Sequence, residues 1–355
     1  VVTNSRERRH PPHREMIVKR TKPTTMAMIA EKAGVARTTV SFILNGRYRE
    51  RGISEKTAQR VRSLAEAMSF VPSETARSLS RRRSGMIGVI LPGFNSAWGE
   101  SIITGIRSRL HKMQTHVPLI AAAHDDDDWE EREIKLLIER GVEAIVCCAT
   151  VRAENYRRIV ERGVPFVFVG HRAKGIPDAS FVAWDGARVA AAATRHLIGK
   201  GRRRIAFLGN VATNPAGSEH YQGHRQALME AKLTPRPEWR IDVPRNFDDG
   251  GMMRAVFSAA ERPDALISDS WQQALHAIEE LDARGLSVPE DVSLLALGDA
   301  PICRHGRIQL SAVVEPAEQI GGMAAEIALK LIADPSRRPI QQLVADYKII
   351  DRATT

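Results

Sequence analysis

Cysteine is scarce in this chain, and long hydrophobic runs are missing. The 355 residues include three cysteines, and two of these, Cys147 and Cys148, are adjacent and therefore poorly placed to form a disulfide with each other. No run of 18 apolar residues is present, which argues against a transmembrane helix. The N-terminal residues contain no apolar segment of the kind found in signal peptides. We therefore expect a cytoplasmic protein in a reducing environment.

Motifs of common enzyme sites are also missing from the sequence. There is no G-x-G-x-x-G, no P-loop and no G-x-S-x-G element, and histidines, cysteines and acids do not occur at metal-ligand spacing. The acidic run at 125–128 is better explained as a solvated turn, because negative charge favours the N-terminus of the helix predicted after it. The sequence predicts a protein that is not an enzyme and has no cofactor or metal.

The net charge of +10 is distributed unevenly along the chain. Residues 1–85 contain 19 lysines and arginines against 7 acidic residues, whereas the remainder contains 33 against 35. Such asymmetry is typical of a nucleic-acid-binding module attached to a nearly neutral body.

Residues 25–46 predict two short helices separated by Gly34. Thr25 is suited to cap the first helix, and Gly34 can adopt the left-handed conformation that ends it. Apolar residues line one side of each helix: Met26, Ile29, Ala30 and Ala33 in the first, and Val40, Ile43 and Leu44 in the second. The other side of the second helix carries Arg37, Thr38, Ser41 and Phe42. A short helix with a polar, basic face fits the DNA major groove, so double-stranded DNA is the predicted partner.

The segments on either side of these helices differ in composition. Residues 1–23 are rich in Arg, His and Pro and predict a disordered basic tail, which either contacts phosphates or has no fixed role. Ser54 is suited to cap a third helix, so that residues 24–71 would form a helix-turn-helix DNA-binding domain. Residues 72–85 predict a helix of under two turns followed by three arginines. Because a helix that short is marginal in water, we expect this linker to be ordered only when something holds it.

From residue 86 onwards, short apolar runs alternate with amphipathic stretches. The apolar runs predict strands at 86–91, 117–121, 144–148, 165–169, 204–208, 265–268 and 292–297. Helices are predicted at 98–113, 129–140, 153–162, 187–198, 219–231, 251–260 and 272–283. This alternation indicates βαβ units and parallel sheets. Two successive sets predict an α/β body with two lobes at 86–355 and a ligand bound beyond the carboxyl ends of the strands.

The order of several motifs resembles the lactose-repressor (LacI/GalR) family of bacterial transcription regulators. The motifs are residues 25–46, Pro72 with 76–79, residues 87–92, 163–165, 196–198, 203–209, 285–293 and 320–322. The resemblance spans about residues 24–353. It implies an all-α helix-turn-helix domain joined to a periplasmic-binding-protein-like body. It also implies a homodimer, or a higher oligomer, that binds a palindromic operator at the bacterial nucleoid and responds to a small effector.

The resemblance assigns DNA-binding roles to residues of the head and linker. These residues are Thr25, Arg37, Thr38, Thr39, Ser41, Phe42, Asn45, Ala76 and Leu79. Arg37 and Thr38 match base-reading positions, although Arg37 could instead contact a phosphate. Thr39, Ser41 and the backbone near Asn45 are expected at phosphates. Phe42 replaces an arginine found in some relatives, and Ala36 replaces a capping serine.

Leu79 matches a leucine that wedges into the minor groove at the operator centre. The alternative is that Leu79 packs only on its counterpart in the second subunit. Ala76 would allow the two hinge helices to approach each other.

Strand ends supply the candidate effector-binding residues. They are Phe94, Asn95, Ser96, Trp98, His171, Arg172, Asp185, His220, Ser270, Trp271 and Asp299. Ser96 and Asp185 are equally suited to capping helices. His220 stands where many sugar-sensing relatives have an arginine, and Ser270-Trp271 replaces a common Asn-Asp pair. These changes argue against assigning any particular sugar. The resemblance implies a sugar, a sugar acid or a similar metabolite, and the tryptophans Trp98, Trp184 and Trp271 favour a flatter, less hydroxylated one.

Three other classes of protein could use parts of this sequence. A transport binding protein would need a signal peptide and would lack the basic head, and a structural nucleoid protein would lack the sensor body. An enzyme on the same α/β body would need one of the motifs that are missing.

Overall fold

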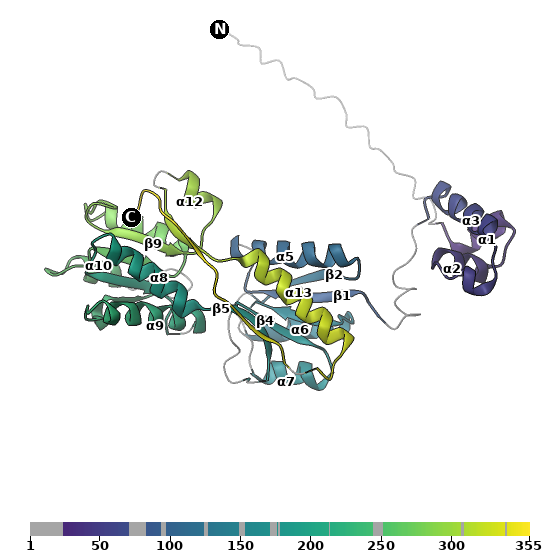
Figure 1. Cartoon of the computed structure of the whole chain (residues 1–355), viewed down its shortest axis with the longest axis horizontal. Helices are drawn as coiled ribbons and strands as arrows, with labels where there is room; N and C mark the ends of the chain where they lie inside the picture. Colours follow the sequence, from purple (N-terminus) through teal and green to yellow (C-terminus); the bar gives the residue numbers. More distant parts are fainter. Residues whose placement is uncertain are drawn as a thin grey trace, which may run out of the picture. The chain divides into compact units, whose positions relative to one another are not determined.

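The computed structural model describes residues 24–70, 83–93, 97–123, 127–148, 153–170, 176, 178–212, 214–243, 251–306, 309–337 and 339–355. The chain divides into two compact units, Val1–Arg77 and Ser78–Thr355 (Figure 1). Below, the described part of the first unit is called the head and that of the second unit the body.

The head is a bundle of three helices. These are α1 (Met26–Ala33), α2 (Arg37–Leu44) and α3 (Glu55–Ala67), with a 3-10 turn η1 (Arg49–Arg51) before α3. The predicted signals are confirmed: the Thr25 and Ser54 hydroxyls accept hydrogen bonds from the backbone N–H groups of Met28 and Thr57, and Gly34 adopts a φ of 62°. The apolar sides meet in a small core of Ile29, Ala30, Ala33, Val40, Ile43, Tyr48, Ala58, Val61 and Ala65.

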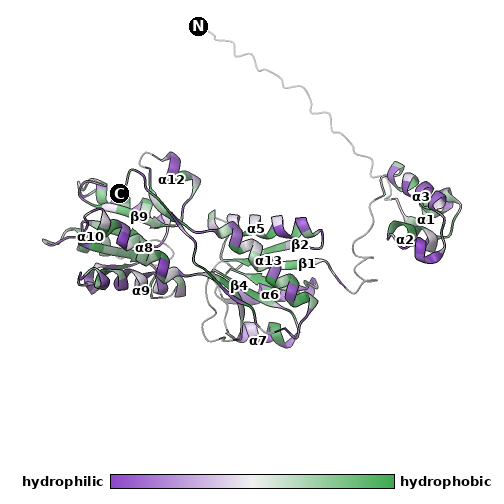
Figure 2. Cartoon of the chain, in the orientation of Figure 1, coloured by the Kyte–Doolittle hydropathy of each residue, from purple (hydrophilic) through white to green (hydrophobic). Residues whose placement is uncertain are grey.

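The first lobe of the body is a parallel sheet of six strands in the order β11-β5-β4-β3-β1-β2. The strands are β1 (Met86–Leu91), β2 (Val117–Ala122), β3 (Ala144–Cys147), β4 (Phe166–Val169), β5 (Ser180–Trp184) and β11 (Gln341–Val344). Its helices are α5 (Ala97–Met113), α6 (Asp127–Glu139), α7 (Ala153–Glu161) and α13 (Ala317–Ala333). Figure 2 shows the apolar strands covered by helices whose outer faces are polar, which explains the predicted alternation.

The second lobe repeats this topology in the order β12-β10-β9-β8-β6-β7, with only β12 antiparallel to its neighbour. The strands are β6 (Ile205–Gly209), β7 (Arg240–Asp242), β8 (Ala265–Ser268), β9 (Ser293–Leu297), β10 (Ser311–Val314) and β12 (Lys348–Ile350). Its helices are α8 (Gly186–Gly199), α9 (Pro215–Glu230), η2 (Pro237–Trp239), α10 (Met252–Phe257), α11 (Trp271–Asp282) and α12 (Pro301–His305).

The chain passes between the lobes after β5, after β10 and after β11. In each sheet the first strand of the lobe lies between the second and the third, so the direction of winding reverses beside β1 and beside β6. In open α/β sheets, such reversals at the carboxyl ends of the strands are where ligands bind.

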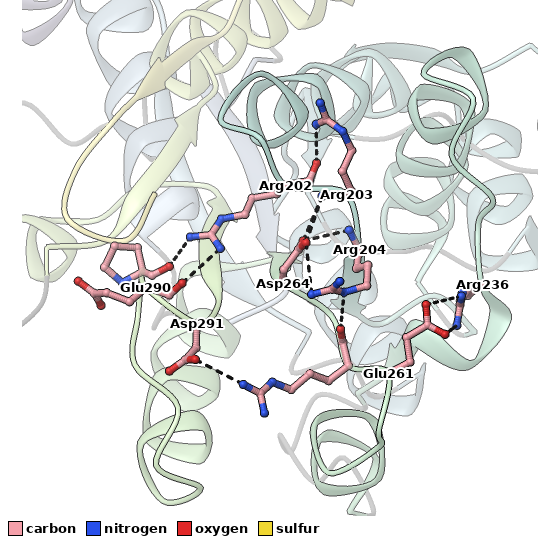
Figure 3. Close-up of polar contacts among 10 residues, drawn as sticks. Arg202, Arg203, Arg204, Arg236, Glu261, Asp264, Glu290 and Asp291 are labelled. Atoms are coloured by element: carbon pink, nitrogen blue, oxygen red, sulfur yellow. Dashed lines mark hydrogen bonds and ion pairs between the residues drawn. The ribbon is translucent and has the colours of Figure 1, made fainter.

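A run of three arginines, Arg202–Arg204, precedes β6 and is used to hold the second lobe together (Figure 3). The Asp264 carboxylate accepts hydrogen bonds from the backbone N–H groups of Arg203 and Arg204, at 3.1 and 2.9 Å. The Arg202 guanidinium donates to the backbone carbonyls of Pro289 and Glu290. The Arg203 guanidinium donates to the Ile198 carbonyl at 2.7 Å, and the Arg204 guanidinium lies 3.7 Å from the Asp264 carboxylate. All three positive charges are therefore engaged in local contacts.

The described helices include none long and apolar enough to cross a membrane.

Candidate functional site

The polar side of α2 faces solvent in the head. Arg37 and Thr38 are exposed in the first turn, and Arg37 forms no ion pair among the described residues. Thr39 and Ser41 are partly buried, and the Asn45 side-chain amide donates to the Ser41 hydroxyl at 3.3 Å. Thr25 caps α1. Val40 and Ile43, on the other side of α2, are buried in the core, so the core fixes which face of α2 is presented.

Two features of α2 depart from a simple polar helix. Ala36, at the N-cap position, has the extended conformation that a cap needs, but it provides no side-chain hydrogen bond. The partly buried ring of Phe42 lies beneath the Arg51 guanidinium, with 4.8 Å from the guanidinium carbon to the ring centroid. The aromatic side chain is thus not open to solvent as an isolated apolar group.

A second group of polar side chains forms where the two lobes of the body meet. Trp98 of α5 and Trp184 at the end of β5 pack edge to face, with centroids 5.6 Å apart. Trp184 Nε1 donates to His220 Nε2 of α9 at 3.4 Å, and His220 Nδ1 hydrogen-bonds to the Asp269 carboxylate. We call Trp98, Trp184, His220, Asp269 and the nearby Glu315 the interlobe cluster.

Glycines allow the interlobe cluster to close tightly. At Gly170, directly after β4, a Cβ atom would lie 2.7 Å from the Trp98 ring, and the φ of 89° also favours glycine. At Gly186, after β5, a Cβ atom would lie 2.8 Å from the His220 ring. At Gly209, the end of β6, it would lie 2.6 Å from the Asp269 side chain. Asp269 therefore lies at the point where the second sheet reverses its winding, between β6 and β8.

The charges of the interlobe cluster influence one another strongly because the group is shielded from water. Burial alone would lower the pKa of His220, but the Asp269 carboxylate raises it above its ordinary value, and Glu315 adds to this effect. Burial raises the pKa of Glu315 to about 7, with His220 opposing and Asp269 reinforcing the change.

The other candidate effector residues have different surroundings. Asp185 caps α8 by accepting from the Arg188 backbone N–H at 3.1 Å, and Ser270 caps α11. Trp271 is partly buried against the core of the second lobe. Both carboxylate oxygens of Asp299 are bound by Arg352 at 2.8 Å, and Arg304 adds a bond of 3.2 Å. Ala76, Leu79, Phe94, Asn95, Ser96, His171 and Arg172 lie outside the described residues.

Sequence reasoning missed Asp269, Glu315 and Arg51. Asp269 follows the predicted strand at 265–268 by one residue, which is the signal used for the other candidates and could have found it. Glu315 follows β10, a strand that was not predicted, so the same signal was missing for it. Nothing in the local sequence places Arg51 over Phe42, since the two residues are brought together by the turn between α2 and α3.

Comparison with known proteins gives matches for both units. Residues 25–73 match the family of bacterial regulatory proteins named lacI, and residues 194–355 match a periplasmic binding protein-like domain. The ribose operon repressor of Haemophilus influenzae is 25% identical over 88% of this chain and 93% of its own length.

Two solved structures extend the comparison. A complex of the transcriptional regulator CelR with cellobiose is 26% identical, has a TM-score of 0.71, and matches over 94% of this chain and 100% of its own. A lac repressor dimer, bound to operator and the anti-inducer ONPF, has a TM-score of 0.82 over 94% of this chain and 99% of its own, and its 18% identity supports the shared fold alone.

An exposed polar helix face on a basic three-helix head, together with a two-lobed periplasmic-binding-protein-like body, defines a DNA-binding transcriptional regulator. The relatives reported are named as regulators or repressors and not as enzymes. Residues 25–73 thus belong to the lacI family of bacterial regulatory proteins, and residues 194–355 to the periplasmic binding protein-like domains.

Proposed function

We propose that this regulator is a homodimeric repressor that acts in the bacterial cytoplasm on a palindromic operator and is controlled by a small polar metabolite. The head is residues 24–71, the hinge 72–85 and the sensor body 86–355. The observation that carries the proposal is the exposed face of α2, with Arg37 and Thr38 in its first turn, on a helix whose other side is fixed by the core. Such a helix presents its N-terminal side chains to base edges in the major groove.

The basic balance of the head supports contact with DNA. Residues 24–70 contain eight lysines and arginines against four glutamates. We assign Thr39, Ser41 and the backbone near Asn45 to phosphate contacts, which position a reading helix without specifying sequence. We assign Leu79 of the hinge to the minor groove at the operator centre, with Ala76 at the approach of the two hinges.

The edge strand β2 supports the dimer. β2 lies at one edge of the first sheet, and its Val117 and Ile120 side chains are 62% and 38% exposed. Met113, at the end of the adjoining helix α5, is 47% exposed. Apolar side chains gathered at a sheet edge are a liability unless another surface covers them. Val117→Asp should therefore shift the full chain towards monomer in sedimentation equilibrium.

The interlobe cluster is the proposed effector site. It joins both lobes at the carboxyl ends of their strands, where a ligand can change how the lobes sit. Trp98 and Trp184 supply aromatic faces, and Trp98 Nε1 is a buried donor without a hydrogen-bond partner among the described residues. His220, Asp269 and Glu315 supply hydrogen-bonding groups. Calorimetry of the full chain against sugars, sugar acids and nucleobases tests this site, and Asp269→Asn should abolish whichever binding is found.

The decisive experiment is selection of bound duplexes from random DNA by the full chain. An inverted repeat whose occupancy changes with one of the metabolites supports the proposal. Recovery of no preferred sequence contradicts it. Leu79→Ala should weaken binding to the selected repeat, and unchanged affinity would remove the minor-groove role.

A further inference from the structure

The loop between α2 and α3 carries three arginines with different environments. Arg47 Nε donates to the Glu50 carboxylate at 3.0 Å. Arg49 donates to the Tyr48 hydroxyl at 3.2 Å and to the Glu55 carboxylate at 3.4 Å. These two guanidinium groups are held by acids of the head itself.

Arg51 differs from the other two. It is exposed and forms no ion pair or side-chain hydrogen bond among the described residues of the head. Its guanidinium carbon lies over the Phe42 ring, 4.8 Å from the ring centroid. A cation–π contact of this kind provides no hydrogen-bond acceptor atom, so the guanidinium N–H groups remain able to donate.

The backbone around Arg51 is fixed. Gly52 adopts a φ of 65°, and its N–H donates to the Arg49 carbonyl at 3.1 Å. The Ile53 N–H donates to the Tyr48 carbonyl at 3.0 Å. The position of Arg51 therefore follows from a closed turn, and the aromatic contact reduces the side-chain entropy that binding would otherwise cost.

Arg51 is stacked on the face of α2 that would enter DNA. Thr38, Phe42 and Asn45 are spaced i, i+4 and i+7 and thus share one side of the helix. If α2 lies in the major groove, the guanidinium above Phe42 lies there with it. An arginine edge in that groove matches O6 and N7 of guanine with two hydrogen bonds.

We propose that Arg51 reads a guanine in each half of the operator and that Phe42 is the positioning residue that aims its guanidinium. The assignment rests on the proposed function and adds a base-reading residue that lies outside α1 and α2, in the loop before α3. Arg51→Ala should lower the preference for guanine at one symmetric position roughly 5- to 150-fold. Arg51→Lys should also lose much of that preference, because an ammonium keeps the charge but not the planar fork.

The test is selection of duplexes from random DNA by the full chain and by the variants Arg51→Ala, Arg51→Lys and Phe42→Leu. Arg60→Ala is the matched control, because Arg60 is exposed on α3 without an ion pair among the described residues. The first three variants should relax the same base pair in each half-site, and the control should select the wild-type sequence. Circular dichroism melting establishes that each variant is folded.

Two results would overturn the inference and remain distinct from failure of the proposed function. If the wild type selects an operator and Arg51→Ala selects the same bases at every position, Arg51 does not read sequence, even if affinity falls evenly. If Arg51→Ala and Phe42→Leu relax different base pairs, the positioning role of Phe42 is wrong. The proposed function itself fails only if the wild type selects nothing.

Discussion

Arg352 and Asp299 form a buried, two-pronged ion pair in the second lobe, with both terminal nitrogens of the guanidinium 2.8 Å from separate carboxylate oxygens. The side chains are 9% and 3% exposed. Arg352 also donates to the Leu310 carbonyl, so the pair ties the end of the chain to the segment before β10. Both oxygens of Asp299 are occupied, which favours a structural role over the effector role that its place after a strand suggested.

Removing one partner of this pair should destabilise the body strongly. Arg352→Met leaves the buried carboxylate with only the exposed Arg304 guanidinium beside it, and breaking a buried ion pair typically costs about 3–5 kcal/mol. Urea unfolding at neutral pH measures the loss. The double variant with Asp299→Asn should recover part of it, because no buried charge then remains. Equal stability of Arg352→Met and the wild type would contradict this account.

The same pair predicts sensitivity to acid. Burial would raise the pKa of Asp299, but the hydrogen bonds and charge of Arg352 hold it below its usual range. A carboxyl group whose pKa is lowered in the folded state stabilises the fold at pH values above its ordinary pKa. This stabilisation is lost as the pH falls through the pKa of the folded state. The wild type should therefore lose stability below about pH 4 more steeply than the double variant.

Gly105 in α5 is required for the contact between α5 and α13. A Cβ atom at Gly105 would lie 1.9 Å from the Glu318 carbonyl oxygen, and one at Gly321 would lie 2.2 Å from the Ile102 carbonyl oxygen. Gly105→Ala must push the helices apart and should cost about 1–3 kcal/mol in urea unfolding. Gly199→Ala is the control, because a Cβ atom there meets nothing within 4 Å. A loss of equal size in the control would contradict the steric explanation.

Glu315 predicts a different dependence on pH. Its pKa is raised to about 7 from 4.5, chiefly by burial. The unfolded chain therefore releases this proton at a lower pH than the folded chain, and the free energy of unfolding falls as the pH rises from about 4.5 to 7. Glu315→Gln should match the wild type at pH 4 and exceed it above pH 7 by about 1–2 kcal/mol, since Glu315 keeps some solvent contact. Glu318→Gln, exposed on α13, is the matched control for removing a carboxylate near the same site.

Local signals in the sequence were sufficient for the head and for most of the sheets. Caps, a terminating glycine and one apolar stripe define α1 to α3, because each depends on residues within one or two turns. No strand range was predicted for β5, β7, β10, β11 or β12. All of these except β7 lie on or near the crossings between the lobes, where pairing partners are far away in the sequence. β7 is a three-residue strand at the edge of its sheet. The helix predicted over 251–260 ends at Phe257.

The candidate effector site could be predicted only in part, for the same reason. Trp98 and His220 were found from strand ends and from the family resemblance, and the structure brings them together through Trp184. Asp299 was also chosen because it follows a strand, but its carboxylate is bound by Arg352. The sequence did not reveal this partner because it lies 53 residues away. Position after a strand marks the edge of the sheet on which a residue lies, whereas long-range partners decide whether its side chain is available.

Ala36 offers a gain of stability in the head. It occupies the N-cap of α2 with φ −66° and ψ 150°, close to those of Ser54 at the N-cap of α3, but has no side-chain oxygen. Ala36→Ser should stabilise the head by about 0.5–2 kcal/mol, and Ser54→Ala should destabilise it by a similar amount. Native-state hydrogen exchange of the amides in residues 24–70 of the full chain measures both changes in stability. No gain from the serine would contradict the view that the start of α2 is incompletely capped.

Arg37 is the residue whose two possible roles can be separated by salt. If Arg37 reads a base, Arg37→Ala should reduce discrimination at one symmetric base pair by about 1–3 kcal/mol. If it only contacts a phosphate, the variant should weaken binding to all sequences evenly and reduce the slope of log affinity against log salt by about 1. We expect the first result, because Arg37 is exposed in the first turn of α2, where side chains reach base edges. Titration of the selected operator and its single-base variants at several salt concentrations distinguishes the two, with Ser41→Ala as the variant expected to change affinity without changing preference.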